Sequence, residues 1–381
     1  MISQKNLRVF VYLLIIFFSI NYIFFTYRFF VRENGFILGD WLINYAGGFV
    51  RRGLVGEIII NLVNLFKLDI IFVSFVVVST LFSFFLYYLI KLIKSSNISF
   101  FILIIIFSPA TLLFNLFDPL AVGRKEIIFF LYLLIYLEFR DHIYSRILLI
   151  PGSLICMLTH ELFILLCPFF FISRYFANNQ IKLKNFSIEF LIIFLSVIYL
   201  FIIIFFSNPD ISKMCLKLLE EGLGQNGKIC LAISSTQKSS FVLGSYIKDI
   251  FYIKYYFIFF VLISLPIYIV LTENLSKNYL ISCVFIVLTI LPFFSLFLIV
   301  NDWGRYLNIF SMYWMIILLH NSKKIINEIK IKKIYLFLVF LFSSTWYMPH
   351  CCPELHFKDK IYNSSTNYLI ERINYRFNYF K

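Results

Sequence analysis

The chain has 381 residues, of which 61% are hydrophobic and 14% are charged, and its mean hydropathy is +0.89. This composition excludes a soluble enzyme, and recurring runs of about 20 apolar residues are typical of membrane-spanning helices. The runs are continuous rather than alternating, so we predict an all-α, polytopic transmembrane helical bundle. The formal charge of +14 does not indicate nucleic acid, because lysine and arginine in membrane proteins mostly fix orientation.

The first span is expected at about residues 7–30. Lys5 and Arg8 flank its start, and their positive charge places the N-terminus in the cytoplasm. The segment is too long and too aromatic for a secretory signal peptide, and no small-residue cleavage site follows it. We therefore expect a retained helix, followed by an outer loop over residues 31–68.

Within that loop, residues 53–66 are too short to span a membrane. Glu57, Asn61 and Asn64 recur at helical spacing and form one polar stripe, while apolar side chains cover the rest. This pattern predicts an amphipathic helix that lies in the membrane interface.

Three further spans are expected between residues 69 and 139, and they lead to the apolar stretch 147–173. As one long helix, this stretch would reverse every later connection and put the basic residues 320–333 outside. As a hairpin of two short arms, it keeps those cations inside and brings His160 and Glu161 toward the outer face. The positive-inside rule favours the hairpin.

After the hairpin, a span at about residues 186–206 leads to a second outer loop over residues 207–254. Cys215 and Cys230 in this loop would form a disulfide if the loop faces an oxidising compartment, and the sequence leaves that question open. Four more spans follow, which gives about ten or eleven spans or half-spans. The predicted division is a transmembrane domain and an extracytoplasmic C-terminal tail, residues 1–348 and 349–381.

The basic connections alone set this topology, yet it places most of the charged clusters on the outer side. We predict that they meet in one site for an anionic substrate. Arginine grips phosphate oxygens bidentately, so the expected ligands of a phosphate or lipid carrier are Arg51, Arg52, Arg124, Lys125 and Arg305. A carboxylate beside a low-dielectric boundary can have a raised pKa, so the expected general bases are Asp40, Asp118 and Glu161. His160 is the further expected catalytic residue. Trp41, Tyr45, Trp303 and Tyr306 offer flat faces for sugar rings, and the expected substrate-binding residues are Trp41, Tyr45, Asp302 and Tyr306.

Each cluster also has a structural interpretation. The paired arginines after the first span would snorkel to lipid head groups, and an interfacial belt is the favoured interpretation of the aromatic residues. Asp118 would cap a helix. His160 and Glu161 would form a buried pair, and Asp302 would pair with Arg305 at i, i+3.

Two tempting motifs are rejected. Residues 222–228 have the spacing of a phosphate-binding P-loop, but Ile229 replaces the serine or threonine that would hold magnesium, and no strand precedes the motif. The histidines and cysteines between His350 and His356 include two adjacent cysteines, which are poor tetrahedral zinc ligands.

As far as about residue 206, the arrangement resembles the GT-C superfamily of membrane glycosyltransferases, which take sugars from polyprenyl-phosphate carriers. The resemblance rests on Asp40 after the first span, on the amphipathic helix at residues 53–66 and on a second acidic site at Asp118. It implies a carboxylate that deprotonates or orients the acceptor hydroxyl. It also implies basic residues and often a divalent metal, Mg²⁺ or Mn²⁺, at the phosphate leaving group. Size and loop length are equally similar to O-antigen and capsule repeat-unit polymerases.

We therefore expect a glycosyltransferase that uses a polyprenyl-linked sugar or oligosaccharide to build a surface polysaccharide. It would act on the extracytoplasmic face of a bacterial inner membrane, among membrane lipids and without nucleic acid. Richness in isoleucine, phenylalanine, lysine and asparagine, as encoded by AT-rich genomes, hints at a bacterium. The alternatives are a flippase or transporter of lipid-linked sugars, whose site would lie near the membrane midplane, and an acyltransferase with His160 as its base.

Overall fold

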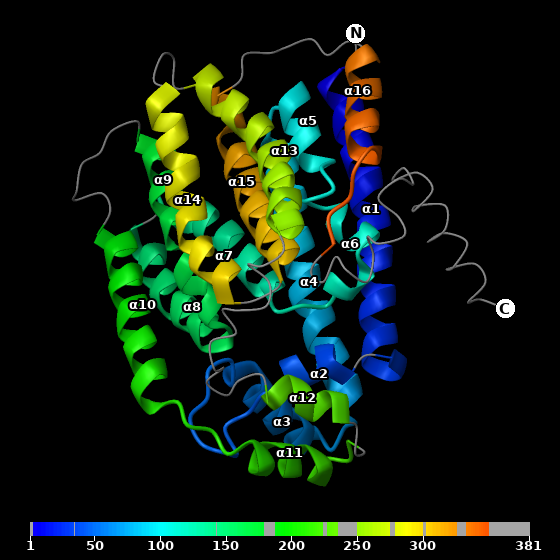
Figure 1. Cartoon of the computed structure of the whole chain (residues 1–381), viewed down its shortest axis with the longest axis vertical. Helices are drawn as coiled ribbons and strands as arrows, with labels where there is room; N and C mark the ends of the chain where they lie inside the picture. The colour runs from blue at the N-terminus through cyan, green and yellow to red at the C-terminus, as the bar shows by residue number, and fades with distance from the viewer. Residues whose placement is uncertain are drawn as a thin grey trace, which may run out of the picture. The chain divides into compact units, whose positions relative to one another are not determined.

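The computed structural model of the chain describes residues 3–33, 35–141, 143–178, 187–223, 227–234, 250–274, 279–299, 302–325 and 333–349. These residues form sixteen α-helices, two 3-10 helices and one π-helix, and none of them lies in a β-strand (Figure 1). The predicted all-α fold is confirmed.

The chain divides into two compact units, and each is described by itself. The first unit comprises Met1–Asn21, Leu92–Val122 and Val242–Lys381, and the second comprises Tyr22–Lys91 and Gly123–Phe241. Two long helices contribute residues to both units: α1 (Gln4–Arg28) and α4 (Ile70–Ser95).

The other elements of the first unit are α5 (Phe100–Ile106), α6 (Phe114–Phe117), η2 (Pro119–Ala121), α13 (Ile250–Asn274), α14 (Tyr279–Ile299), α15 (Trp303–Ile325) and α16 (Lys333–Ser344). Those of the second unit are η1 (Phe29–Glu33), α2 (Gly35–Trp41), α3 (Leu54–Phe66), α7 (Glu126–Phe139), α8 (Ile143–Thr159), η3 (Glu161–Leu166), α9 (Cys167–Asn178), α10 (Ser187–Phe206), α11 (Ile211–Glu220) and α12 (Gly227–Ser234).

Among the described residues, four helices are long and apolar enough to cross a membrane: Gln4–Val31, Ile70–Ser95, Ser187–Phe206 and Ile253–Thr272. Their outward faces are apolar as well; Phe206 at the end of α10 is 72% exposed and Leu13 in α1 is 59% exposed. Such surfaces suit lipid rather than water. A membrane protein is therefore supported, while ten or eleven spans and their orientation remain predictions.

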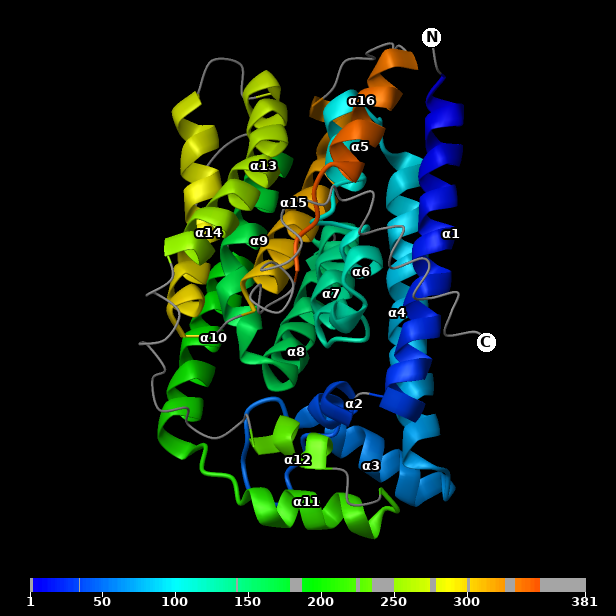
Figure 2. The same ribbon diagram turned by 45° about the vertical axis from the view of Figure 1, so that its right-hand side comes forward.

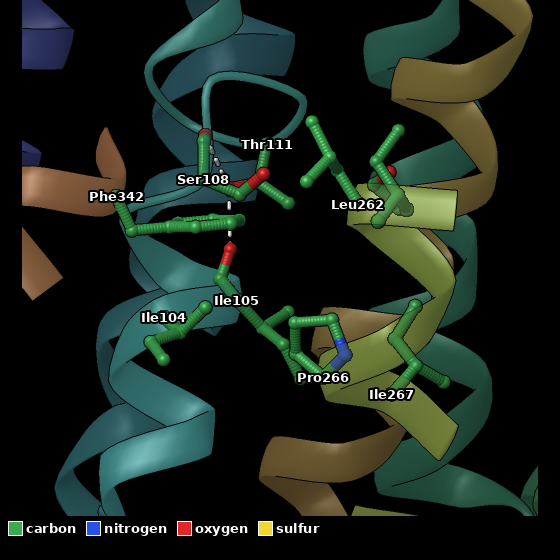
Figure 3. A pocket seen from close by; sticks show the side chains of 10 residues that line it. Ile104, Ile105, Ser108, Thr111, Leu262, Pro266, Ile267 and Phe342 are labelled. Carbon is green, nitrogen blue, oxygen red and sulfur yellow. Dashed lines mark hydrogen bonds between the residues drawn. The ribbon is translucent and has the colours of Figure 1, made fainter. Parts of the chain in front are cut away.

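In the first unit, α5 packs against α13, α15 and α16. Where α5 ends, the hydroxyl of Thr111 lies 2.7 Å from the carbonyl oxygen of Ile105 and 2.9 Å from that of Ile106. Ile105, Thr111 and Pro266 of α13 line a small cavity, in which the centre of a water molecule can move within about 10 Å³ (Figure 3). That is room for about one water, so this cavity is a packing feature and not a substrate site.

The second unit contains the predicted hairpin, formed by α8, η3 and α9 (Figure 2). Arg140, at the end of α7, donates a hydrogen bond to the carbonyl oxygen of Ser173 at 2.7 Å, and Arg174 donates to Asp141 at 2.6 Å. The start of α8 and the end of α9 therefore meet, and the chain reverses between them. The prediction that this stretch folds as a helical hairpin is confirmed, and its placement in a membrane remains a prediction.

The reversal begins at His160, whose backbone is extended at φ −165°. Its Nδ1 accepts a hydrogen bond from the backbone N–H of Leu162 at 3.1 Å and caps η3. Phe163 and Phe170 pack edge-on against Tyr132 of α7, with ring centroids 5.3 and 5.6 Å away. These aromatic rings hold the hairpin against α7.

Four short helices, α2, α3, α11 and α12, gather at one end of the second unit and form what we call the cap (Figures 1 and 2). α3 begins and ends within one residue of the predicted amphipathic helix, and it buries Val55, Ile59, Ile60 and Val63. Whether α3 lies in a membrane interface remains a prediction.

Glycines let the segments of the cap approach closely. A Cβ atom at Gly39 of α2 would lie 2.6 Å from the carbonyl oxygen of Ile229 in α12, and one at Gly47 would overlap the carbonyl oxygen of Asp210. The structure also pairs Cys215 with Cys230 in a disulfide that joins α11 to α12, with Cα atoms 5.8 Å apart. The described part of the second predicted outer loop therefore packs against the first predicted outer loop.

Candidate functional site

Arg52 is the centre of an ion-pair cluster in the second unit. Its Nε donates to both carboxylate oxygens of Glu161, at 3.1 and 2.8 Å, and its Nη2 donates to Oε1 at 2.5 Å. Arg51 Nη1 lies 3.3 Å from the same carboxylate. Arg52 Nη1 lies 3.7 Å from Oδ1 of Asp40, which is only 4% exposed. Side chains from α2, from the loop before α3 and from the hairpin tip therefore converge on one point.

Lys125 completes this group, which we call the arginine cluster: Asp40, Arg51, Arg52, Lys125 and Glu161. Lys125 precedes α7 and is wholly buried. Its Nζ donates to the backbone carbonyl of Arg52 at 3.0 Å. Burial lowers the pKa of Lys125 to about 8, and the attraction of the Asp40 carboxylate offsets only part of that effect.

The backbone at Arg52 has a positive φ of 71°. This left-handed conformation costs a residue with a Cβ atom about 1–3 kcal/mol and persists only where the surroundings impose it. Here the Glu161 carboxylate and the Lys125 ammonium hold the side chain and the carbonyl of Arg52. The next residue, Gly53, has no room for a side chain, because a Cβ atom there would overlap the Tyr45 ring. A strained backbone conformation that neighbouring side chains hold in place is typical of a functional site.

Glu161 does not fit the predicted general base. Burial raises the pKa of its carboxyl group, but the charges of Arg52 and Arg51, together with the Arg52 hydrogen bonds, hold that pKa well below its usual value. Glu161 is therefore ionised and anchors the two arginines. The expectation of a raised pKa is wrong for this carboxylate, because the sequence did not show that both arginines reach it.

The structure brings together six of the predicted site residues in the second unit: Asp40, Arg51, Arg52, Lys125, His160 and Glu161. Arg124, in the same unit, lies over the ring of Phe36, 5.5 Å from its centroid. These six residues therefore lie together as predicted, and whether they form a functional site remains a prediction.

Four of the other predicted residues belong to the first unit. Asp118 accepts a hydrogen bond from the backbone N–H of Leu120 at 3.1 Å and caps η2, as its structural interpretation expected. Arg305 donates to Asp302 at 3.1 Å, which confirms their expected pairing. Tyr306 packs beside Phe297, with ring centroids 6.1 Å apart. Whether these residues join the arginine cluster remains a prediction.

The two aromatic residues predicted near Asp40 differ in access. Trp41 is wholly buried, and its Nε1 donates to the carbonyl oxygen of Gly123 at 2.6 Å. It therefore holds α2 in place and offers no face to a sugar ring, which corrects that prediction. Tyr45 is partly exposed and stacks on Phe49. Burial and the nearby Glu57 carboxylate raise the pKa of Tyr45 to about 12, so its hydroxyl stays protonated beside the cluster.

Sequence reasoning missed Tyr199, which lies in the apolar helix α10. The buried residues of α10 are Glu189, Ile192, Ser196 and Tyr199, and three of these four are polar and share one face at helical spacing. The helix that carries Tyr199 packs against η3, which begins at Glu161. The polar spacing within an apolar run is the signal that would have found it.

The residues present do not fit the divalent cation that the resemblance implies. Among the described residues, no group of three or more His, Cys, Asp or Glu side chains is arranged to hold a metal ion. Both oxygens of Glu161 already accept hydrogen bonds from Arg52. The cysteine-containing stretch 350–356 lies outside the described residues, as does part of the loop 222–228.

The arginine cluster therefore offers concentrated positive charge, two carboxylates and a partly exposed tyrosine at one end of a helical unit. Its function has to be argued from these groups, because the chain matches no protein-family model, no curated protein and no solved structure.

Proposed function

We propose that the arginine cluster binds the phosphate of a lipid-linked sugar. The chain would then be an integral membrane glycosyltransferase that builds a surface polysaccharide from polyprenyl-phosphate-linked donors. The observation that supports this is the charge balance of the cluster. It contains three cations, Arg51, Arg52 and Lys125, and two carboxylates, Asp40 and Glu161. Lys125 is buried, whereas Arg51 and Arg52 are partly exposed. A surplus of positive charge near apolar helices favours an anion, and arginine's fork matches phosphate oxygens.

The two carboxylates then have different roles. Glu161 is ionised and holds both arginines in place. Asp40, which is nearly buried beside Arg52, takes the proton of the acceptor hydroxyl. The acceptor oxygen forms the new bond to the sugar carbon while the bond from that carbon to the phosphate oxygen breaks. The arginines stabilise the negative charge left on the phosphate.

The location of the cluster favours this proposal over a transporter. Transport sites lie near the membrane midplane between broken helices, whereas Arg52 and Asp40 belong to the cap and Glu161 to the hairpin tip. His160 is a poor base for the acyltransferase alternative, because its Nδ1 already accepts the N–H of Leu162. Protonation of that nitrogen would break the turn.

The test is a transfer assay with the purified chain in liposomes, supplied with radiolabelled polyprenyl-phosphate-linked hexoses and a carbohydrate acceptor. We expect a labelled glycoside and released carrier phosphate from the wild type. Asp40→Asn should lower turnover by about 10²–10⁴-fold, as expected for loss of a general base, without loss of folded protein. Asp69→Asn is the matched control, because Asp69 is exposed and caps α4 through the N–H of Phe72.

Full activity of Asp40→Asn would remove this carboxylate from the mechanism. Passage of labelled donor across the liposome membrane without a new glycosidic bond would refute the enzyme and support the transporter.

A further inference from the structure

The buried face of α10 carries three polar groups, and two of them have partners within the protein. Glu189 accepts a hydrogen bond from the hydroxyl of Tyr136 at 2.5 Å. The hydroxyl of Ser196 lies 2.7 Å from the carbonyl oxygen of Ile192 and 3.4 Å from the sulfur of Cys167. Tyr199, the third, lies one turn beyond Ser196.

The hydroxyl of Tyr199 differs from the other two. The residue is 6% exposed, and its buried oxygen has no hydrogen-bond partner among the described residues. Burying a hydroxyl without a partner is unfavourable, and such groups are rare in native proteins. A phenylalanine would fill the same space without that penalty, so the hydroxyl needs another explanation.

The surroundings of Tyr199 indicate what the hydroxyl would bind. Helix α10 packs against η3, which begins at Glu161, and Ser196 contacts Cys167 directly after η3. Tyr199, one turn further along the same buried face, therefore lies on the side of α10 that packs near the arginine cluster. The Glu161 oxygens already accept hydrogen bonds from Arg52. A phenol donates a hydrogen bond without adding charge, and phosphate oxygens are strong acceptors.

We propose that Tyr199 is a ligand-contacting residue whose hydroxyl donates a hydrogen bond to the phosphate of a lipid carrier held at Arg51 and Arg52. This inference rests on the proposed function and adds a third, uncharged donor to the phosphate site. The donor is preorganised, because α10 and the hairpin bury its ring before the ligand arrives.

The test compares Tyr199→Phe with Tyr132→Phe in the full-length chain. Tyr132 is buried in the same unit, but its hydroxyl donates to the carbonyl oxygen of Leu149 at 2.8 Å. Binding of undecaprenyl phosphate in detergent micelles is measured for both variants, with undecaprenol and inorganic phosphate as further probes. The thermal midpoint of the empty protein is measured alongside.

We expect Tyr199→Phe to bind undecaprenyl phosphate about tenfold more weakly, the loss expected for one hydrogen bond to a charged group. Its affinity for undecaprenol should be unchanged, and its thermal midpoint should be equal to or above that of the wild type. Tyr132→Phe should show the reverse, with a lower midpoint and unchanged affinity.

Equal affinities of the wild type and Tyr199→Phe would overturn this inference alone. So would a midpoint of Tyr199→Phe that falls as far as that of Tyr132→Phe, because the hydroxyl would then have an internal partner. A wild type that binds inorganic phosphate but no lipid phosphate, or neither, would overturn the proposed function as well.

Discussion

At the scale of single residues, Lys125 links the site to the stability of the fold. Its ammonium group is wholly buried and donates to the carbonyl of Arg52, whose backbone is strained. The folded state therefore disfavours the charged form, and the pKa falls from 10.5 to about 8. Between these two pH values the unfolded chain holds a proton that the folded chain has released, so stability rises with pH across this window.

This linkage gives the first prediction. Relative to Lys125→Met, the wild type should gain roughly 3 kcal/mol of unfolding free energy between about pH 8 and 10.5, because stability rises by about 1.4 kcal/mol per pH unit while one proton separates the two states. Affinity for the lipid phosphate should fall over the same window, because the neutral amine no longer attracts the anion. Denaturant unfolding and binding titrations at matched pH values measure both.

Lys91→Met is the control for this experiment, because Lys91 is exposed and pairs with Glu138. The Lys91→Met variant should show the same rise in unfolding free energy and the same fall in affinity for the lipid phosphate as the wild type. The same pH dependence in Lys125→Met would contradict the assignment of the titration to Lys125.

Six residues of the second unit that the sequence predicted to meet are in contact in the structure, because charges beside apolar spans must pair or bind. The sequence did not predict their individual roles. The low pKa of Glu161 depends on both arginines reaching one carboxylate, and the burial of Trp41 depends on a hydrogen bond to Gly123, 82 residues away. Contacts of this kind join distant segments, and a pattern of neighbouring residues cannot show them.

At the scale of elements, the hairpin was predictable from charge and length, but the contacts that hold it together were not. Positive charge on both sides of the stretch 147–173 required its two ends to return to the same face. Arg140 makes these contacts. It is 2% exposed and donates hydrogen bonds to the carbonyl oxygen and the hydroxyl of Ser173.

Arg140→Ala should therefore loosen the hairpin. The loss of two hydrogen bonds from a buried cation is expected to cost about 2–3 kcal/mol, which lowers the thermal midpoint by about 5–10 °C in a unit of this size. Scanning calorimetry or a thermal-shift assay in detergent measures the change. Lys91→Ala removes an exposed ion pair and should leave the midpoint where it is. An unchanged midpoint in Arg140→Ala would show that the hairpin is held elsewhere.

At the scale of the whole molecule, the sequence predicted a helical membrane protein, and four helices of sufficient length and hydropathy support it. Span number and orientation depend on water, lipid and charge outside the protein, and the fold alone does not determine them. The structure pairs Cys215 with Cys230; stable disulfides form in oxidising compartments, and an outer location of the cap stays a prediction.

Orientation is therefore the last prediction. Ala46 lies exposed in the cap, between α2 and α3, and Lys94 lies exposed near the far end of α4. α4 has 26 residues and is about 39 Å long at 1.5 Å per residue, which is enough to cross a bilayer. We expect a membrane-impermeant maleimide to label Ala46→Cys in intact cells and Lys94→Cys only after permeabilisation, in a background with Cys283, Cys351 and Cys352 replaced by serine. Labelling of both from outside would show that α4 does not span. The reverse pattern would place the arginine cluster in the cytosol, where it would meet no outer-face donor, and the proposed function would fail with it.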